Sequence, residues 1–414
     1  MTSSPARDSA VKDGPNVPLI IICGCLIALI GFGPRSSLGL FLAPMTEARD
    51  WSREVFSLAL AIQNLMWGAG QPIAGMIADR YGTARTVTFG ALLYIAGLAM
   101  MSFVESPMLL HLSAGVMIGL GVAFSSFTLV LAAFGRAVTP AKRSIAFGVG
   151  TAAGSFGQFL FAPLGQALID GFGWHQALLV LAGIVAMVPF LSIALKGKPA
   201  ALPAHAGEKD QRLGEALAEA FGTRGFLLLT FGFFVCGFHV AFITVHLPPY
   251  IVDLGLDPSW GAIAIALIGF CNVFGALAAG YIGGRYSKPH FLSLIYLGRA
   301  AAITIFLMVP ATPLTVLVFA ATMGFLWLST VPPTSGLVAV MFGPRYMATL
   351  FGFVFFSHQI GAFLGVWLGG RIYDQTGSYD PIWWMGIALG IFAALVHWPI
   401  REEPVARLAG TPAE

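Results

Sequence analysis

The sequence predicts an all-α, polytopic membrane protein with twelve transmembrane helices in two six-helix bundles, related by a pseudo-twofold repeat. Three observations predict it: an apolar composition, twelve long apolar stretches, and a glycine pattern that recurs in the second half. Of the 414 residues, 57% are hydrophobic and 10% are charged, whereas soluble globular chains carry roughly 25% charged residues. The composition also excludes a disordered chain, because such chains are charge-rich and poor in aromatic residues.

Twelve stretches meet the requirement of about 20 mostly apolar residues for a spanning helix. They cover residues 17–44, 55–78, 86–104, 107–134, 144–169, 176–195, 225–250, 259–283, 290–309, 313–341, 348–370 and 382–400. We therefore expect five parts along the chain. These are an N-terminal tail (1–16), an N-terminal bundle (17–196), a polar linker (197–224), a C-terminal bundle (225–400) and a C-terminal tail (401–414).

The basic residues predict the orientation of this topology, because cytoplasmic loops are enriched in Lys and Arg. With both termini in the cytoplasm, 17 of the 22 basic residues fall in cytoplasmic segments, and Arg49, Arg53 and Arg371 fall in loops on the outer side. The other two, Arg35 and Arg299, lie inside predicted spans. We expect a multi-pass protein of the cell (inner) membrane with both tails in the cytoplasm. The net charge of +3 gives no indication of nucleic-acid binding.

The two halves share a pattern at an offset of 204 residues. Ser125 recurs as Ser329, and the set Gly148, Gly157, Gly165, Asp170 and Gly173 recurs as Gly352, Gly361, Gly369, Asp374 and Gly377. A chance origin is implausible for so many pairs in the same order. Two six-helix halves related in this way are one known construction of a secondary transporter.

The loop after the second predicted span carries a motif. Residues 75–85, GMIADRYGTAR, resemble the signature loop of the major facilitator superfamily, G-x-x-x-D-R/K-x-G-x-R/K-R/K. The resemblance covers nearly the whole chain and implies the major facilitator fold. It also implies a conformational latch, formed by Gly75, Asp79, Arg80, Gly82, Arg85 and the repeat counterpart Arg285. The alternative is a solvated basic loop that only sets topology.

The ionisable residues inside the spans indicate the charge of a ligand. No carboxylate lies clearly inside a span, whereas Arg35, Arg299, His239, His246 and His358 do. Charged residues in spans are costly and mark function. Cation transporters and carboxylate proton relays need a buried acid, so this set favours an anionic substrate. We expect Arg35 to pair with a substrate carboxylate; the alternative is that its side chain snorkels to the outer surface.

The histidines are candidates for proton coupling, because imidazole changes charge near neutral pH. His239 is the repeat counterpart of Arg35, and His246 lies two helical turns further along. The alternative is that both are neutral, hydrogen-bonded interior residues. Arg299, in the ninth span, is expected to hold helices together or to snorkel.

The resemblance implies that the first helix of each three-helix unit lines a central cavity. The expected substrate-binding residues are therefore Arg35, Ser125, His239, Trp327 and Thr330, with His358 and Gln359 of the eleventh span added. No nucleotide loop, metal-ligand cluster or catalytic constellation is visible in the sequence. We expect no enzyme activity, no cofactor and a monomer in the lipid bilayer.

The sequence thus predicts a secondary transporter of a small organic anion, a monocarboxylate, coupled to protons. The first span and residues 143–174 resemble bacterial monocarboxylate porters and oxalate/formate exchangers. One departure is that those families tend to place a substrate-binding arginine in span eight, where this chain offers only Asn272. The alternatives are an exporter of hydrophobic or amphipathic compounds and a sensor that does not transport.

Overall fold

The computed structural model describes residues 16–138, 140–196, 211–343 and 346–408, and these are almost entirely helical. The helices of the first half are α1 (Val17–Ser36), η1 (Leu38–Phe41), α2 (Leu42–Arg49), α3 (Arg53–Tyr81), α4 (Thr83–Ser102), α5 (Pro107–Leu110), η2 (His111–Met117), α6 (Ile118–Phe124), α7 (Phe127–Ala137), α8 (Pro140–Val185), α9 (Val188–Ser192) and η3 (Ile193–Leu195). Those of the second half are α10 (Leu213–Gly222), α11 (Arg224–Asp253), α12 (Pro258–Gly283), α13 (Lys288–Met308), α14 (Pro313–Leu326), α15 (Val331–Phe342), α16 (Met347–Thr376) and α17 (Asp380–His397).

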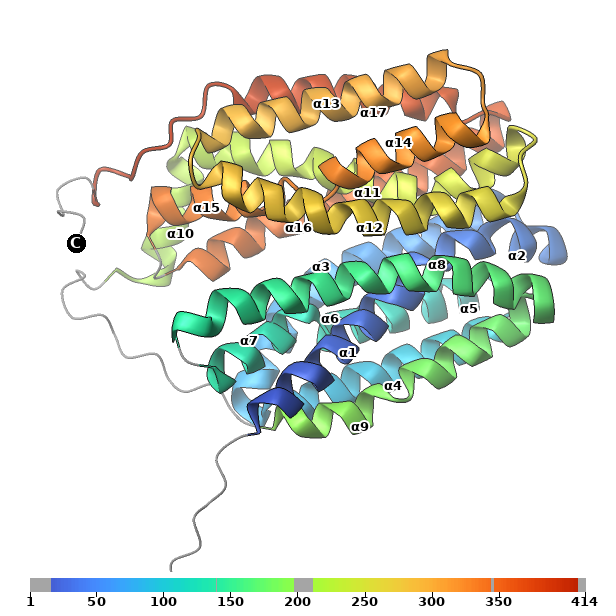
Figure 1. Ribbon diagram of the computed structural model, residues 1–414, viewed down its shortest axis with the longest axis horizontal. Helices are drawn as coiled ribbons and strands as arrows, with labels where there is room; N and C mark the ends of the chain where they lie inside the picture. The colour runs from blue at the N-terminus through green and yellow to red at the C-terminus, as the bar shows by residue number, and fades with distance from the viewer. Residues whose placement is uncertain (1–15, 139, 197–210, 344–345, 409–414) are drawn as a thin grey trace, which may run out of the picture.

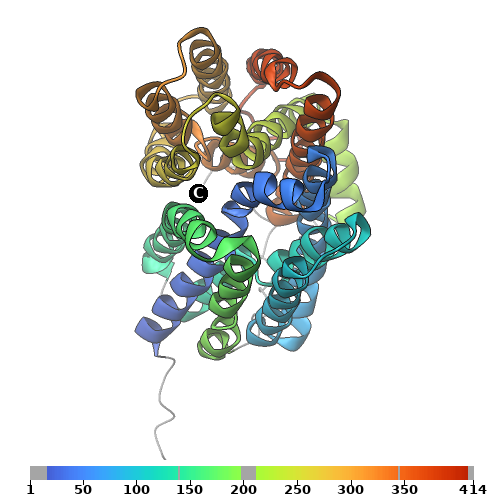
Figure 2. The same cartoon turned by 90° about the vertical axis from the view of Figure 1, so that its right-hand side faces the viewer.

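The helices form two groups that lie side by side, one from each half of the sequence (Figures 1 and 2). We call them the N-half (17–196) and the C-half (213–400). Successive long helices run in alternating directions, so the bends gather at two ends of the molecule. The linker end holds Val17, Lys196 and Gln211, and the opposite end holds Arg53, Asp253 and Asp374 (Figure 1).

Ten of the described helical segments are long and apolar enough to cross a membrane. The predicted count of twelve is consistent with this for two reasons. The segment Gly148–Leu195 counts once, although Gly173 breaks it with φ +77°, where the chain turns back. Helix α3 is not among the ten, and its interior carries Gln63, Asn64 and Gln71. The predicted class, a polytopic all-helical membrane protein, is confirmed.

Two of the predicted spans are broken at repeat-related positions. In the N-half the break between α6 and α7 falls at Ser125 and Ser126, and in the C-half the break between α14 and α15 falls at residues 327–330. In the second break, the fully buried Arg299 of α13 donates to the carbonyl oxygens of Leu326, at 2.8 and 3.2 Å, and of Trp327. Backbone groups freed within a membrane need such partners, so Arg299 holds helices together.

Two pairs of long helices pack together between the halves, and η1 also packs against α11. Helix α3 packs along α16, and the first limb of α8 packs along α12. Asn272 Nδ2 donates to Ser155 Oγ at 3.0 Å, and Gln158 Nε2 donates to the carbonyl of Ile265 at 3.3 Å. Both bonds cross from α8 to α12 in the middle of these helices. The surface between the halves is therefore partly polar at mid-depth.

Candidate functional site

Arg35 lies near the end of α1 and is directed at helix α3 of the same half. It donates a hydrogen bond from Nη2 to Asn64 Oδ1, and its guanidinium carbon lies 4.5 Å from the centre of the Trp67 ring. Asn64 is eleven residues into α3, about 17 Å from the start of that helix. The guanidinium of Arg35 therefore lies against the interior of α3 and does not extend to the end of that helix.

The same part of α3 faces helix α16 of the C-half. The ring of Trp67 meets that of Phe355 edge to face, with centroids 5.6 Å apart. The side chain of Gln359 occupies the space beside Gly68 that a Cβ would need. Gln359 is fully buried, and its Oε1 lies 3.3 Å from Nδ1 of the neighbouring His358. The structure thus brings Arg35 and Gln359 to one surface between the halves, with Asn64 and Trp67 between them.

The other expected lining residues are engaged inside their own halves. Ser125 Oγ donates to the carbonyl of Gly121 at 2.7 Å. Thr330 Oγ1 lies 3.2 Å from Cys236 Sγ, within the C-half. Trp327 is buried at the broken helix beside Arg299. Among the described residues no hydrogen bond joins any of these three to Arg35, although the carbonyl of Ser125 lies beside Gly31, one helical turn before Arg35.

Both candidate proton-coupling histidines are buried within the C-half. His239 Nε2 lies 2.7 Å from the carbonyl of Gly386 on α17, and its Nδ1 has no hydrogen-bond partner. His246 Nε2 lies 2.8 Å from the carbonyl of Val366, and its Nδ1 lies 3.1 Å from the Tyr379 hydroxyl. Of the two, His246 is the one connected to a contact between the halves, because Tyr379 also binds Arg53.

The residues of the predicted latch lie at the linker end. Gly82 has φ +96°, as a tight turn there requires. Arg80, Arg85 and Arg285 are exposed; Arg80 lies over the ring of Tyr81, and Arg285 lies over that of Tyr281. A Cβ at Gly75 would meet no described atom within 4 Å, so none of the described helices packs closely against it. The side chain of Asp79 lies outside the part of the chain that the structure describes.

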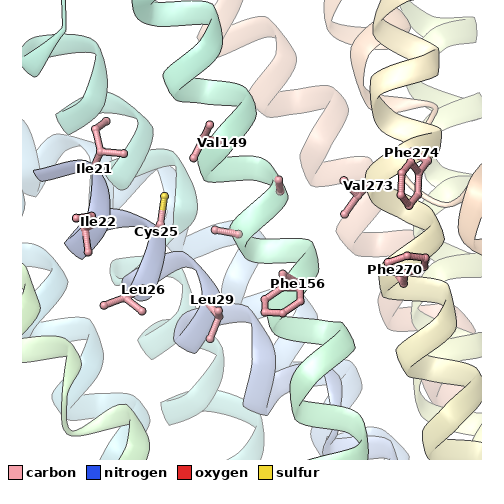
Figure 3. Close-up of a pocket in the computed structure, with 12 residues that line it drawn as sticks. Ile21, Ile22, Cys25, Leu26, Leu29, Val149, Phe156, Phe270, Val273 and Phe274 are labelled. Atoms are coloured by element: carbon pink, nitrogen blue, oxygen red, sulfur yellow. The ribbon is translucent and has the colours of Figure 1, made fainter. Parts of the chain in front are cut away.

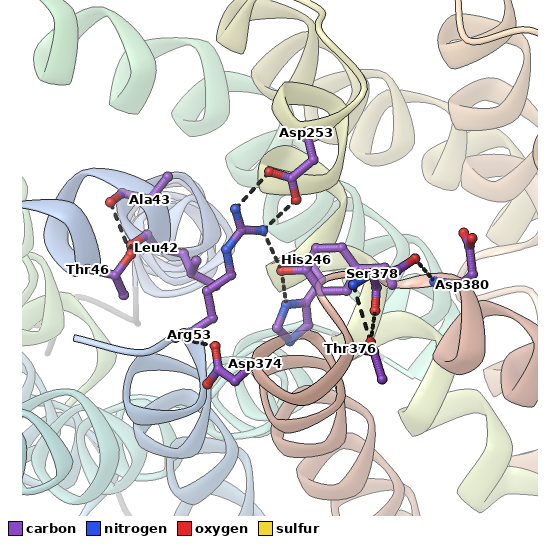
Figure 4. A network of polar contacts seen from close by, with 11 residues as sticks. Leu42, Ala43, Thr46, Arg53, His246, Asp253, Asp374, Thr376, Ser378 and Asp380 are labelled. Atoms are coloured by element: carbon purple, nitrogen blue, oxygen red, sulfur yellow. Dashed lines mark hydrogen bonds and ion pairs between the residues drawn. The ribbon is translucent and has the colours of Figure 1, made fainter. Parts of the chain in front are cut away.

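A polar network joins the halves at the opposite end (Figure 4). Arg53 of α3 makes two hydrogen bonds with Asp253 of α11, at 2.7 and 2.8 Å, and a third with the Tyr379 hydroxyl at 3.1 Å. Asp374 of α16 accepts from the backbone nitrogens of Arg53 and Glu54 at 3.0 and 2.7 Å. Its charge therefore caps the first turn of α3, where an anion is stabilised.

Glu54 extends this network along α16. Its Oε1 accepts from Trp367 Nε1 at 3.0 Å and pairs with Arg371 at 3.5 Å. We call the set Arg53, Glu54, Asp253, Asp374 and Tyr379, with Trp367 and Arg371, the opposite-end network. All of these contacts except that of Tyr379 with His246 cross between the N-half and the C-half.

An apolar groove of about 580 Å³ lies on the outer surface between the halves (Figure 3). Helices α1 and α8 form one wall and α12 forms the other. Its lining is Ile21, Ile22, Cys25, Leu26, Leu29, Val149, Ala152, Ala153, Phe156, Phe270, Val273 and Phe274. Without polar lining residues the groove suits hydrocarbon, and it lies apart from Arg35.

Sequence reasoning missed the residues around Arg35 on α3 and those of the opposite-end network. Asn64 and Trp67 are three residues apart and thus share one face of α3. That polar and aromatic pair within a predicted span was the available signal. Arg53 and Arg371 were interpreted only as outside-loop charges, because nothing in the sequence pairs Arg53 with a carboxylate 200 residues away.

Known proteins resemble the chain over nearly its full length. It is 24% identical over 417 residues to the uncharacterised MFS-type transporter YcxA of Bacillus subtilis, covering 96% of this chain and 98% of that one. It is 27% identical over 370 residues to mouse (Mus musculus) monocarboxylate transporter 11, covering 85% and 80% of the two chains.

Solved structures share the fold at low identity. A point mutant of the nucleoside transporter NupG matches with a TM-score of 0.72 at 13% identity, over 92% of this chain and 99% of that chain. A bacterial homologue of the human lysosomal transporter Spinster, inward-facing and unoccupied, matches with a TM-score of 0.71 at 15% identity, over 92% and 94%. The family profile described as Major Facilitator Superfamily matches residues 24–366. The chain therefore belongs to the major facilitator superfamily of membrane transporters.

Proposed function

We propose that this transporter moves a small organic anion, a monocarboxylate, by alternating access and in company with a proton. The carrying observation is the position of Arg35. Its guanidinium lies over Trp67, which meets Phe355 of the C-half, and donates to the neutral amide of Asn64. Among the described residues its Nε has no hydrogen-bond partner. A carboxylate bound there neutralises the charge and accepts from the guanidinium.

The relatives support the anion. Several curated proteins that resemble the chain over most of its length are named monocarboxylate transporters, among them the mouse protein above and its human counterpart at 27% identity. At such identity the name supports a substrate class and not a particular acid. We retain Arg35, His358 and Gln359 as the proposed substrate side of the site. Ser125, Trp327 and Thr330 lie at the helix breaks, and His239 packs against α17.

We assign proton coupling to His246, with His239 as the second candidate. His246 contacts the Tyr379 hydroxyl, and Tyr379 contacts Arg53. A positive charge on His246 repels Arg53 and so weakens the contact of Tyr379 with Arg53. Protonation of His246 therefore favours separation of the halves at the opposite end. We further propose that the linker end lies in the cytoplasm, that the protein is a monomer in the cell membrane, and that the predicted latch acts when the linker end closes.

One observation favours a second candidate, export of amphipathic compounds. The apolar groove of Figure 3 lies between the halves and faces outward, where a hydrophobic compound can approach from the bilayer. If cells carrying the protein are protected against hydrophobic compounds, and vesicles show no carboxylate uptake, this candidate replaces the first.

The test is uptake of radiolabelled acetate, lactate, pyruvate and benzoate into proteoliposomes with an inward proton gradient. We expect Arg35→Gln to lower uptake by about 100-fold, since removing one partner of a buried charge pair costs about 2–5 kcal/mol. Arg49→Gln is the matched control, because Arg49 lies over Trp174 at the opposite end and loses the same charge. Normal uptake by a folded Arg35→Gln protein contradicts the proposal.

A further inference from the structure

Three buried N–H groups that have no hydrogen-bond partner among the described residues lie around the contact of α3 with α16. They are Arg35 Nε, Trp67 Nε1 and Gln359 Nε2. Leaving a buried donor unpaired is costly, and such groups in a native structure call for an explanation. All three are donors, and they come from both halves of the protein.

The surroundings of each group leave its N–H free for a ligand. Arg35 uses Nη2 on Asn64 and lays its guanidinium over the face of Trp67, which leaves the indole edge unused. Gln359 uses Oε1 toward His358, which leaves its amide nitrogen unused. Gly68 follows Trp67 directly in α3, and its lack of a side chain lets Gln359 reach this position.

We propose that Trp67 and Gln359 complete, with Arg35, a carboxylate-binding site that spans the two halves. This inference rests on the proposed function. It deepens that function by assigning two further residues that bind the carboxylate. A carboxylate has two oxygens and about four acceptor positions, so it accepts from the guanidinium edge, the indole N–H and the amide N–H together. The ring of Phe355, against Trp67, forms an apolar wall for the organic part of the acid.

Neutral and cationic ligands fit this site poorly. A carboxamide has one acceptor oxygen in place of two and adds N–H donors to a site that already has an excess of them. A cation meets Arg35 without any carboxylate among the side chains that the structure describes around it. The donor set therefore selects for the anionic form of a carboxylic acid over its amide.

The test measures binding of acetate, lactate, pyruvate and benzoate, and of the amides of these acids, by thermal shift and by tryptophan fluorescence of the purified full chain. Trp67→Phe keeps an aromatic face for Arg35 and removes only the N–H. Gln359→Leu removes the amide. Trp384→Phe is the matched control, because Trp384 is exposed on α17.

We expect Trp67→Phe and Gln359→Leu each to raise the Kd for the carboxylates about tenfold, equal to about 1.4 kcal/mol, with unchanged melting in their absence. Gln359→Glu should weaken binding further, because it adds a negative charge. Trp384→Phe should bind as the unmodified protein does, and the amides should bind weakly to every variant.

The outcomes separate this inference from the proposed function. If Arg35→Gln abolishes carboxylate binding while Trp67→Phe and Gln359→Leu bind normally, the inference is overturned and the proposed function stands. If all variants bind normally, or if no carboxylate of the panel stabilises the unmodified protein, both are overturned. If a variant does not fold, Trp67→Tyr and Gln359→Met take its place in the same measurement.

Discussion

The two ends of the molecule differ in how the halves meet. At the opposite end, Arg53, Asp253 and Asp374 join α3 to α11 and α16 through charged hydrogen bonds of 2.7–3.0 Å. At the linker end, Arg80 and Arg285 contact rings of their own half. In the described part of the chain, every ion pair that crosses between the halves lies at the opposite end.

This difference shows that the sequence motif identifies the fold, whereas the contacts identify where the halves are joined in this state. The signature loop identifies the fold, yet in this state its described side chains hold nothing across the halves. The opposite-end network belongs to no recognised motif, yet it forms the charged contacts between the halves that the structure describes. At the opposite end the halves are therefore joined by charged contacts, and we propose that the latch acts in the other state of the cycle.

The largest expected effect is the loss of the Arg53–Asp253 pair. Charge-assisted hydrogen bonds contribute about 2 kcal/mol. Arg53→Gln should therefore raise the population with the halves separated at the opposite end about 30-fold relative to the population with them joined. The reporter is Ser57→Cys, a buried position beside Gly370 at this end, in a protein whose native cysteines are replaced. Because separation of the halves exposes this position, Arg53→Gln should accelerate its labelling by maleimide by the same factor. The exchanged pair Arg53→Asp with Asp253→Arg should recover slow labelling, and equal rates in all three proteins refute the assignment.

A smaller effect is expected from Asp374, which caps α3 from the other half. Loss of a helix cap costs about 1 kcal/mol, so Asp374→Ala should accelerate labelling of Ser57→Cys about fivefold. The comparison variant is Asp257→Ala, because Asp257 caps α12 within its own half and its loss does not separate the halves. Similar acceleration by both variants means that helix fraying, and not separation of the halves, exposes the cysteine.

The smallest effect on this state is expected from the latch. Exposed side chains contribute within about 0.5 kcal/mol, so Arg85→Gln and Arg285→Gln should change labelling of Ser57→Cys less than about twofold. Transport should nevertheless slow, because the latch acts when the linker end closes. Unchanged uptake rates in proteoliposomes favour the alternative of a solvated loop that only sets topology.

The fold class followed from composition and span length, which depend on solvent and not on particular contacts. The repeat also has a structural counterpart that the sequence did not predict, because Ser125 and Ser329, at the offset of 204, both lie at a helix break. Arg35 could be chosen as a candidate from the sequence because a cation in an apolar span needs a stabilising partner. Its contacts with Asn64 and Trp67 could not be predicted, since they form only when α1, α3 and α16 pack together.

Pairs between the halves were harder still. Arg53 and Asp253 do not correspond under the repeat, whose offset takes residue 53 to Asp257. Each lies near a loop, where a charge is ordinary. Likewise the histidines share one helix face in the sequence, but that periodicity does not distinguish His246, near a contact between the halves, from His239, which contacts α17. Only the packing of α11 against α16 and α17 distinguishes the surroundings of the two histidines.

The charge on Arg35 has an electrical consequence. In the proposed cycle the empty carrier holds the positive charge of Arg35, and the loaded carrier adds a carboxylate at Arg35 and a proton at His246, so the two have the same net charge. A membrane potential acts on a charge with about 2.3 kcal/mol per 100 mV, scaled by the fraction of the field that the charge crosses. Voltage should therefore act alike on the loaded and the empty step and cancel over a complete cycle. A carrier that bound the anion without the proton would be neutral when loaded, and its net uptake would depend on voltage.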